Sequence, residues 1–147
     1  MTSFSDLYRE LILDHYKHPK HYGSLEDPAI RVHRLNPTCG DEVTVSVRLA
    51  DGRVEDIAFE GHGCSISQAS ASVLTDLVVG RDLDEVRRVD QEFHKMLRRE
   101  DYDEELVGDA VAFEGVASLP LRVKCAILGW GALRDAIIED GVEEPTA

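Results

Sequence analysis

An alternating run of apolar and polar residues over positions 43–49 constrains the fold of this chain more than any other feature. Its apolar members are Val43, Val45, Val47 and Leu49. A period of two puts them on one face of a β-strand, which is therefore half buried. The pair Asp51-Gly52 follows and is typical of a two-residue hairpin turn, because both central positions of that turn need positive φ. The return strand carries its apolar residues at Val54, Ile57 and Phe59. The chain is therefore predicted to contain an antiparallel hairpin.

Helical spacing of apolar residues occurs on both sides of this hairpin. It predicts helices over about residues 5–17, 66–78, 83–97 and 120–139. Residues 29–35 are predicted to add a third strand, and residues 106–116 a short helix and turn. Residues 98–109 are acidic and show no clear period. We therefore expect an α+β fold in which several helices pack on a small antiparallel sheet.

The chain is predicted to be one domain over residues 5–140, followed by a short acidic tail over residues 141–147. Of its 147 residues, 43% are hydrophobic, and a chain of this size removes roughly two-thirds of its unfolded surface from water. The sequence has no internal repeat and no low-complexity tract, and its five prolines are scattered. One hydrophobic core is therefore expected.

The charge balance limits the partners of the chain. It has 29 acidic residues against 16 Lys and Arg residues, so the formal charge is −13, and no run of basic residues is present. Nucleic acid is therefore not an expected partner. No stretch approaches about 18 apolar residues, and charged residues interrupt the first thirty positions. Neither a membrane span nor an export signal is expected.

The three cysteines differ in their surroundings. Their odd number, with 24 and 60 residues between them, does not form the paired framework of a small secreted domain, so we expect a cytoplasmic protein with reduced thiols. Cys39 lies in a turn bounded by proline and glycine. Cys64 opens a helix, where free N–H groups stabilise a thiolate. Cys125 faces inward near the start of the last helix, with Lys124 beside it. Each thiol taken alone could also be a small buried apolar residue.

Asp41 is a fourth candidate ligand. In an extended segment residues i and i+2 project to the same side, so Cys39 and Asp41 can converge on one ion. Together with Cys64 and Cys125 they form a plausible tetrahedral zinc set of three thiolates and one carboxylate. Two alternatives stay open: Asp41 can be a turn residue that bonds its local backbone, and His62 can be a ligand. The sequence has no Cys-x-x-Cys pair, so spacing alone does not decide between them.

Three histidines near the N-terminus recur at three-residue steps, at His15, His18 and His21. On a continuous helix two of them could reach one metal ion, but Pro19 interrupts the register. We therefore expect solvated or core-edge histidines here rather than ligands.

Three cysteine-bearing segments resemble those of the IscU/NifU-like iron–sulfur cluster assembly proteins. They are residues 36–41 (Asn-Pro-Thr-Cys-Gly-Asp), 61–67 (Gly-His-Gly-Cys-Ser-Ile-Ser) and 122–128 (Arg-Val-Lys-Cys-Ala-Ile-Leu). The likeness extends to residues 12–19 and covers about residues 5–138. It implies a compact domain in which the four candidate ligands, Cys39, Asp41, Cys64 and Cys125, meet at one exposed end.

Two features of the sequence favour the SufU type within this family. Scaffold-type members carry a histidine directly before the last cysteine, where this chain has Lys124. SufU-type members carry extra residues before the last helix, and residues 93–116 resemble that insertion. The SufU type implies a zinc-dependent sulfurtransferase that works with a pyridoxal-phosphate cysteine desulfurase of the SufS type and with other iron–sulfur assembly proteins.

The same resemblance implies roles for individual residues. Cys39 would be the catalytic residue, because in the family's mechanism a desulfurase histidine replaces this cysteine on zinc and the freed thiolate attacks the persulfide of the desulfurase. Lys124 would be auxiliary to the site. Two other functions stay open: a scaffold on which a transient iron–sulfur cluster is built, and a zinc-stabilised interaction domain without transfer chemistry.

Overall fold

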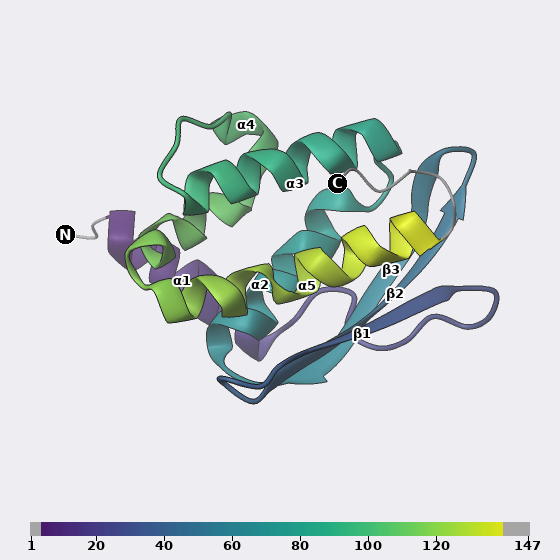
Figure 1. The fold of residues 1–147 in the computed structure, drawn as a ribbon, viewed down its shortest axis with the longest axis horizontal. Coiled ribbons are helices and arrows are strands. Elements are labelled where there is room, and N and C mark those ends of the chain that lie inside the picture. The colour runs from purple at the N-terminus through teal and green to yellow at the C-terminus, as the bar shows by residue number, and fades with distance from the viewer. Residues whose placement is uncertain (1–3, 140–147) are drawn as a thin grey trace.

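The computed structural model describes residues 4–139 of the chain (Figure 1). The elements in chain order are α1 (Phe4–Lys17), β1 (Ile30–Asn36), β2 (Asp41–Ala50), β3 (Arg53–His62), α2 (Ser65–Val78), α3 (Leu83–Leu97), α4 (Glu104–Val107), the 3-10 helix η1 (Gly108–Ser118) and α5 (Pro120–Glu139). The predicted tail at 141–147 and the last predicted domain residue, 140, lie outside the described residues. No helix within 4–139 is both long enough and apolar enough to cross a membrane.

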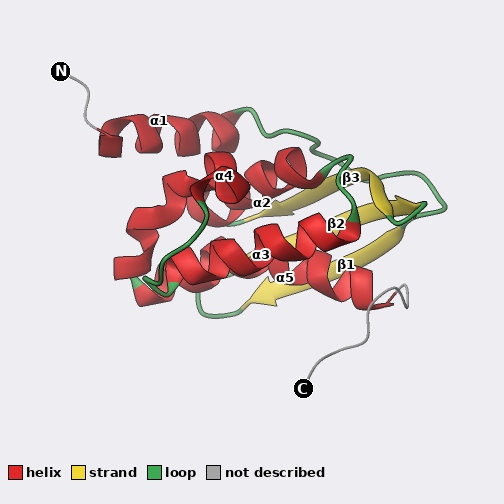
Figure 2. Ribbon diagram, turned by 90° about the horizontal axis from the view of Figure 1, so that it is seen from above, coloured by secondary structure: helices red, strands yellow, loops and turns green. Residues whose placement is uncertain are grey.

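The three strands form an antiparallel sheet in the order β1-β2-β3. Val45 in the central strand is paired with Val32 on one side and with Phe59 on the other. Val45 and Phe59 are fully buried, because α2 and α5 cover one face of the sheet (Figure 2). Helix α1 packs on α2, and α3 packs on η1 and α5. The predicted α+β class, the hairpin and the third strand are thus confirmed.

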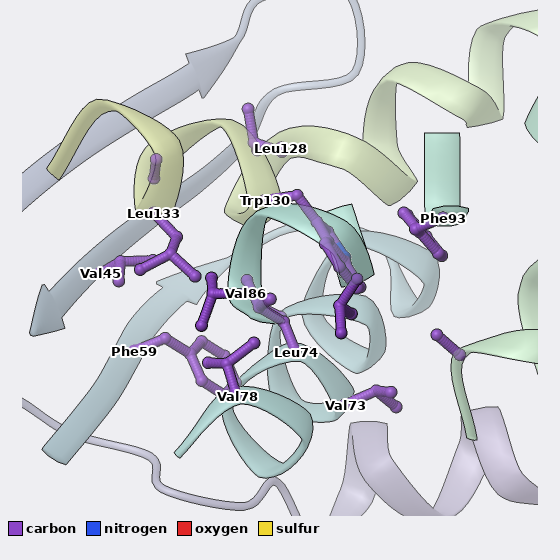
Figure 3. Packing of buried hydrophobic residues seen from close by; sticks show 14 of the residues in the cluster. Val45, Phe59, Val73, Leu74, Val78, Val86, Phe93, Leu128, Trp130 and Leu133 are labelled. Atoms are coloured by element: carbon purple, nitrogen blue, oxygen red, sulfur yellow. The ribbon is translucent and has the colours of Figure 1, made fainter. Parts of the chain in front are cut away.

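Apolar side chains from the helices and the sheet form one core (Figure 3). Trp130 of α5 stacks on Phe93 of α3, with ring centroids 4.0 Å apart and planes 7° from parallel. The indole N–H of Trp130 donates to the Ser70 hydroxyl at 3.0 Å, and this hydroxyl donates to the Ala126 carbonyl at 2.6 Å. A buried tryptophan keeps its polar atom satisfied in this way. The network ties α5 to α2 close to Cys125.

The segment between α3 and α5 differs from its prediction. The expected short helix and turn over 106–116 is instead the one-turn helix α4 followed by η1. Ala110, Phe113 and Val116 recur every three residues and are all buried. Because a 3-10 helix has three residues per turn, this spacing places all three side chains on the side that faces the core. A period of three does not match the α-helical period of about 3.6 residues, so the sequence pattern did not predict this helix.

His15 of α1 is a core-edge histidine, as expected. It is buried, and its Nδ1 lies 2.7 Å from the Ser72 hydroxyl oxygen of α2. The same oxygen accepts the backbone N–H of Lys20 at 2.7 Å. Burial lowers the pKa of His15 below the usual 6.5 and outweighs the attraction of Asp76. The folded protein therefore favours the neutral imidazole.

This burial should make the protein less stable in mild acid. The unfolded chain binds a proton on His15 more readily than the folded protein does. The contribution of neutral His15 is therefore present above pH 6.5 and is lost as the pH falls through the lower folded pKa. Urea unfolding of metal-free protein at about pH 7 and about pH 5 gives the free energy of unfolding at each pH. The decrease in this free energy between the two pH values should be smaller in His15→Gln than in wild type. His33→Gln, at an exposed histidine, is the control, and equal losses in all three proteins would contradict the role of His15.

Candidate metal centre

The four predicted ligands meet at one end of the molecule, where separate elements begin or end (Figure 1). Cys39 lies in the loop between β1 and β2, and Asp41 begins β2. Cys64 is the N-cap residue of α2, and Cys125 lies in the second turn of α5. Cys39 is exposed and Cys64 is half-buried, whereas Asp41 and Cys125 are fully buried. The site therefore has one ligand at the surface and two at its base.

Three of the four candidate ligands have atoms close enough to share one ion. Those of Cys39, Asp41 and Cys125 are all within 4.8 Å of one another. The Sγ atoms of Cys39 and Cys125 are 3.5 Å apart, and the Sγ atom of Cys64 is 3.6 Å from Asp41 Oδ2. A tetrahedral zinc ion with Zn–S bonds of about 2.3 Å separates two sulfur ligands by about 3.8 Å. The thiols of Cys39 and Cys125 and the carboxylate of Asp41 fit such an ion in kind and spacing. The thiol of Cys64, which lies beside Asp41 Oδ2, is a fourth donor of the right kind.

Asp41 is held in place by the start of α2. Its Oδ1 accepts the backbone N–H of Cys64 at 2.7 Å, which leaves Oδ2 facing the Cys64 sulfur. A fully buried carboxylate needs such partners, because desolvation without them is costly. Asp41 therefore does accept a backbone N–H, but from a segment distant in sequence, and it also presents Oδ2 to the Cys64 sulfur.

Gly63 permits this close approach. Its φ is +148°, and a Cβ built on it would lie 2.2 Å from Asp41 Oδ1 and 2.8 Å from Asp41 Cα. We therefore expect Gly63→Ala to displace Asp41 and to weaken metal binding roughly 10- to 100-fold, as loss of an orienting contact does at other metal sites. Competition with a chelator measures this change. Gly115→Ala is the control, since nothing lies within 4 Å of its added Cβ. Equal affinities in the two variants would refute the steric argument.

Cys64 occupies the helix start that the sequence predicts. Its Sγ accepts the backbone N–H of Ser67 at 3.4 Å, so the sulfur caps α2 as a serine hydroxyl would. The unpaired N–H groups and the dipole at this end of the helix favour a negatively charged sulfur. Cys64 is therefore a candidate ligand whose position is set by the start of the helix.

Cys125 is the most enclosed of the three thiols. Burial raises its pKa far above the ordinary thiol value, and hydrogen bonding with Asp41, Cys39 and Cys64 raises the pKa further. In the metal-free protein this thiol therefore keeps its proton at neutral pH. A cation held by this thiol would take the place of that proton, so metal binding here would release it.

Arg122 is a residue of the site that the sequence interpretation did not single out. Interaction with Cys125, and with nearby Cys64, raises the pKa of its guanidinium group. The signal for it was its place three residues before Cys125, because residues i and i+3 share a helix face. Lys124, the predicted auxiliary residue, is exposed and leaves the helix about 100° around the axis from Cys125.

His62, which the sequence left open as a ligand, lies at the exposed end of β3. Its Nδ1 is 3.3 Å from Glu42 Oε1, and the two residues face each other across β2 and β3. The structure therefore brings together Cys39, Asp41, Cys64 and Cys125 and pairs His62 with a carboxylate outside this group.

Known proteins share both the sequence pattern and the fold of this chain. The NifU-like N terminal domain matches residues 7–139. The chain is 42% identical over 140 residues to the zinc-dependent sulfurtransferase SufU of Bacillus subtilis, covering 95% of each chain. It is 39% identical over 138 residues to the iron–sulfur cluster assembly scaffold protein IscU of Streptococcus pyogenes, covering 93% of this chain and 86% of that one.

A solved structure agrees with these matches. The crystal structure of FiSufU from Fervidobacterium islandicum, described as an iron–sulfur cluster assembly scaffold protein for the SUF system, superposes with a TM-score of 0.84. The two sequences are 33% identical, and the superposition covers 92% of this chain and 99% of that one.

Proposed function

This chain belongs to the NifU-like N terminal domain family and acts in iron–sulfur cluster assembly, and from this premise we propose that it is a zinc-dependent sulfur carrier. Its proposed partner is a pyridoxal-phosphate cysteine desulfurase of the SufS type, whose persulfide sulfur it accepts on Cys39. Other iron–sulfur assembly proteins would receive the sulfur. The similarity to a protein named a zinc-dependent sulfurtransferase supports both zinc and sulfur transfer. Three free thiols suit a reducing compartment such as the cytoplasm.

The asymmetry of the ligand set carries this proposal. Cys39 is exposed in a loop, whereas Cys64 caps the start of α2, Cys125 lies in the second turn of α5 and Asp41 is fully buried. A loop residue can leave the site through changes in a few backbone torsions. Cys64 or Cys125 could leave only if a helix start unwound. Three ligands can therefore retain the ion while Cys39 reaches a partner.

Zinc would be held by Cys39, Asp41, Cys64 and Cys125, and when bound it keeps thiols deprotonated at neutral pH and brings no redox chemistry of its own. The chain's own groups support the negative sulfur atoms. The helix start favours charge on Cys64. The guanidinium of Arg122 does the same for Cys125.

Sulfur transfer to Cys39 is a thiol–disulfide exchange. The Cys39 thiolate attacks the terminal sulfur of the desulfurase persulfide, and the sulfur–sulfur bond of that persulfide breaks. The desulfurase cysteine leaves as a thiolate, and Cys39 becomes a persulfide that keeps the proton of the transferred sulfur. No net oxidation or reduction occurs. The exposure of Cys39 suits this step, because the attacking sulfur must enter the active site of the partner.

A scaffold that builds clusters on the same cysteines is the second candidate, because the relative from Streptococcus pyogenes is named a scaffold. The residue before Cys125 counts against it, since the ammonium group of Lys124 has no lone pair to offer a metal. The third candidate is an interaction domain that uses zinc for stability alone. The exposed loop position of Cys39 counts against that function, because a ligand that can leave the ion is not needed where zinc serves stability alone.

Metal analysis of anaerobically purified protein, combined with desulfurase turnover, tests the proposal. We expect about one zinc per chain and faster conversion of cysteine by a SufS-type desulfurase when the chain is added. A stable iron–sulfur cluster in preference to zinc would favour the scaffold. Zinc without any stimulation of turnover would favour the interaction domain.

A further inference from the structure

Asn36 is the only asparagine of the chain and lies at the end of β1, directly before the loop that carries Cys39. It is 7% exposed, although its neighbours Leu35 and Pro37 are exposed. A buried carboxamide needs an acceptor for its N–H groups and a donor for its oxygen. For Asn36 these partners belong to the metal centre and to the Cys39 loop.

Asn36 accepts every backbone N–H of the loop over residues 37–40. Pro37 has no N–H group, so the donors are Thr38, Cys39 and Gly40. The N–H of Thr38 donates to Asn36 Oδ1 at 3.2 Å. The N–H groups of Cys39 and Gly40 donate to the backbone carbonyl oxygen of Asn36 at 3.3 and 2.8 Å. One residue therefore fixes the backbone on both sides of the exposed thiol.

The other half of the Asn36 carboxamide faces the buried thiol. Its Nδ2–H group donates to the Sγ atom of Cys125, with 3.9 Å between nitrogen and sulfur. This sulfur also lies 3.5 Å from the Sγ atom of Cys39. Hydrogen bonds from outside the ligand set orient metal ligands and tune their charge. The bond from Asn36 does not involve the Cys39 side chain, so it can persist when that side chain leaves.

We propose that Asn36 is a positioning residue that couples the Cys39 loop to the metal centre. Its two oxygens hold Cys39 in the ligand position, and its Nδ2–H group supports the negative charge of Cys125. The inference rests on the proposed function, in which Cys39 leaves the site to accept sulfur. The test of this role needs no desulfurase, so the role of Asn36 and the proposed function can fail separately.

Two substitutions at Asn36 distinguish its side-chain contact with the loop from its contact with Cys125. Asn36→Asp keeps an oxygen for the Thr38 N–H but puts a second oxygen where the donor to Cys125 was. Asn36→Ala removes both side-chain contacts and leaves the backbone carbonyl in place. Gln68→Glu is the matched control: Gln68 is also a carboxamide that is 7% exposed near the site, but its Nε2 donates to the Ser67 hydroxyl at 3.1 Å.

The first readout is the rate at which iodoacetamide alkylates Cys39 in the zinc-loaded protein, followed by peptide mass spectrometry. Loss of one ordinary hydrogen bond should open the loop roughly three- to tenfold more often. We therefore expect Asn36→Ala to react faster by about that factor and Gln68→Glu to react at the wild-type rate. A wild-type rate in Asn36→Ala overturns the role of Asn36 in holding the loop.

Hydrogen exchange in the wild-type protein checks the loop without any variant. The amide hydrogens of Thr38 and Gly40 should be protected, because both are bonded to Asn36. Free exchange at Thr38 overturns the loop-holding role even where Asn36→Ala fails to fold.

The second readout is the thiolate-to-cobalt charge-transfer absorption of the Co²⁺-substituted protein. Replacing an N–H donor by a carboxylate oxygen makes the Cys125 sulfur a better electron donor, so this band should move to lower energy in Asn36→Asp. Zinc affinity should fall roughly 10- to 100-fold. Gln68→Glu should change neither. An unchanged band and affinity in Asn36→Asp overturn the contact with Cys125.

These outcomes are independent of sulfur transfer. If both readouts change as expected but wild-type protein does not stimulate a desulfurase, the proposed function fails and the role of Asn36 stands. If wild type stimulates but neither readout changes, only the role of Asn36 fails.

Discussion

Cys39→Ser should return the turnover of a SufS-type desulfurase to the rate of the desulfurase alone, while the variant keeps its fold. A serine hydroxyl does not ionise near neutral pH and is no acceptor for a persulfide sulfur. Because Cys39 is exposed in a loop, its replacement removes little packing. The measurement is turnover with cysteine under anaerobic, zinc-replete conditions. Mass spectrometry should find no persulfide on Cys64 or Cys125.

Asp41→Ala is the matched variant for this test, since it removes a ligand and keeps the acceptor. Its transfer activity should fall with its zinc content and recover when zinc is in excess. Serine at Cys64 or Cys125 should release zinc more readily than Asp41→Ala does, because sulfur ligands dominate the affinity for zinc. Full stimulation by Cys39→Ser would place the acceptor elsewhere and would leave the scaffold as the better function.

The fold could be predicted where one local pattern decides the structure. The hairpin turn needs positive φ at two consecutive positions, and Asp51 and Gly52 have φ values of 55° and 72°. Helix α3 begins at Leu83, as its apolar spacing predicts, and the Asp82 side chain caps it by accepting the N–H of Glu85 at 2.8 Å. In η1 every third residue is apolar and buried, and this spacing resembles neither the period of a strand nor that of an α-helix. Whether the segment forms a 3-10 helix depends on the core against which these residues pack.

The candidate site could be predicted from local chemistry only in part. The helix start at Cys64 follows from a short segment. The expectation for Cys39 and Asp41 assumed an extended segment, but residues 37–40 form a turn in which Gly40 has a φ of 70°, so their convergence depends on that turn. The contact between Cys39 and Cys125 joins residues 86 positions apart, and periodicity carries no such information. That convergence came from the family resemblance. The contact of Arg122 with the site was missed because its spacing from Cys125 places both on one helix face but does not show that this face lines the site.

Removal of zinc should lower the melting temperature by roughly 10 °C. An ion that binds only the folded state stabilises it by RT ln(1 + [L]/Kd), which is about 4 kcal/mol at a thousandfold excess over Kd. For a domain of this size each kcal/mol shifts the melting temperature by roughly 2 to 4 °C. Calorimetry of zinc-loaded and chelator-treated protein, with metal content measured in both samples, tests the estimate.

The residues that remain after zinc is removed explain why the loss should be this large. Asp41 and Cys125 are fully buried at the base of the site. Without a cation the Asp41 carboxylate keeps the Cys64 N–H and thiol as partners but loses the charge of the ion, and a buried carboxylate that loses such a partner destabilises the folded state. Cys125→Ser lacks a ligand, so it should melt at the lower temperature and show little further change with a chelator. Adding zinc back should restore the wild-type melt and leave that of Cys125→Ser unchanged. If the wild-type melt stays the same after verified zinc removal, the ion does not stabilise the fold, and the core around Trp130 and Phe93 alone accounts for its stability.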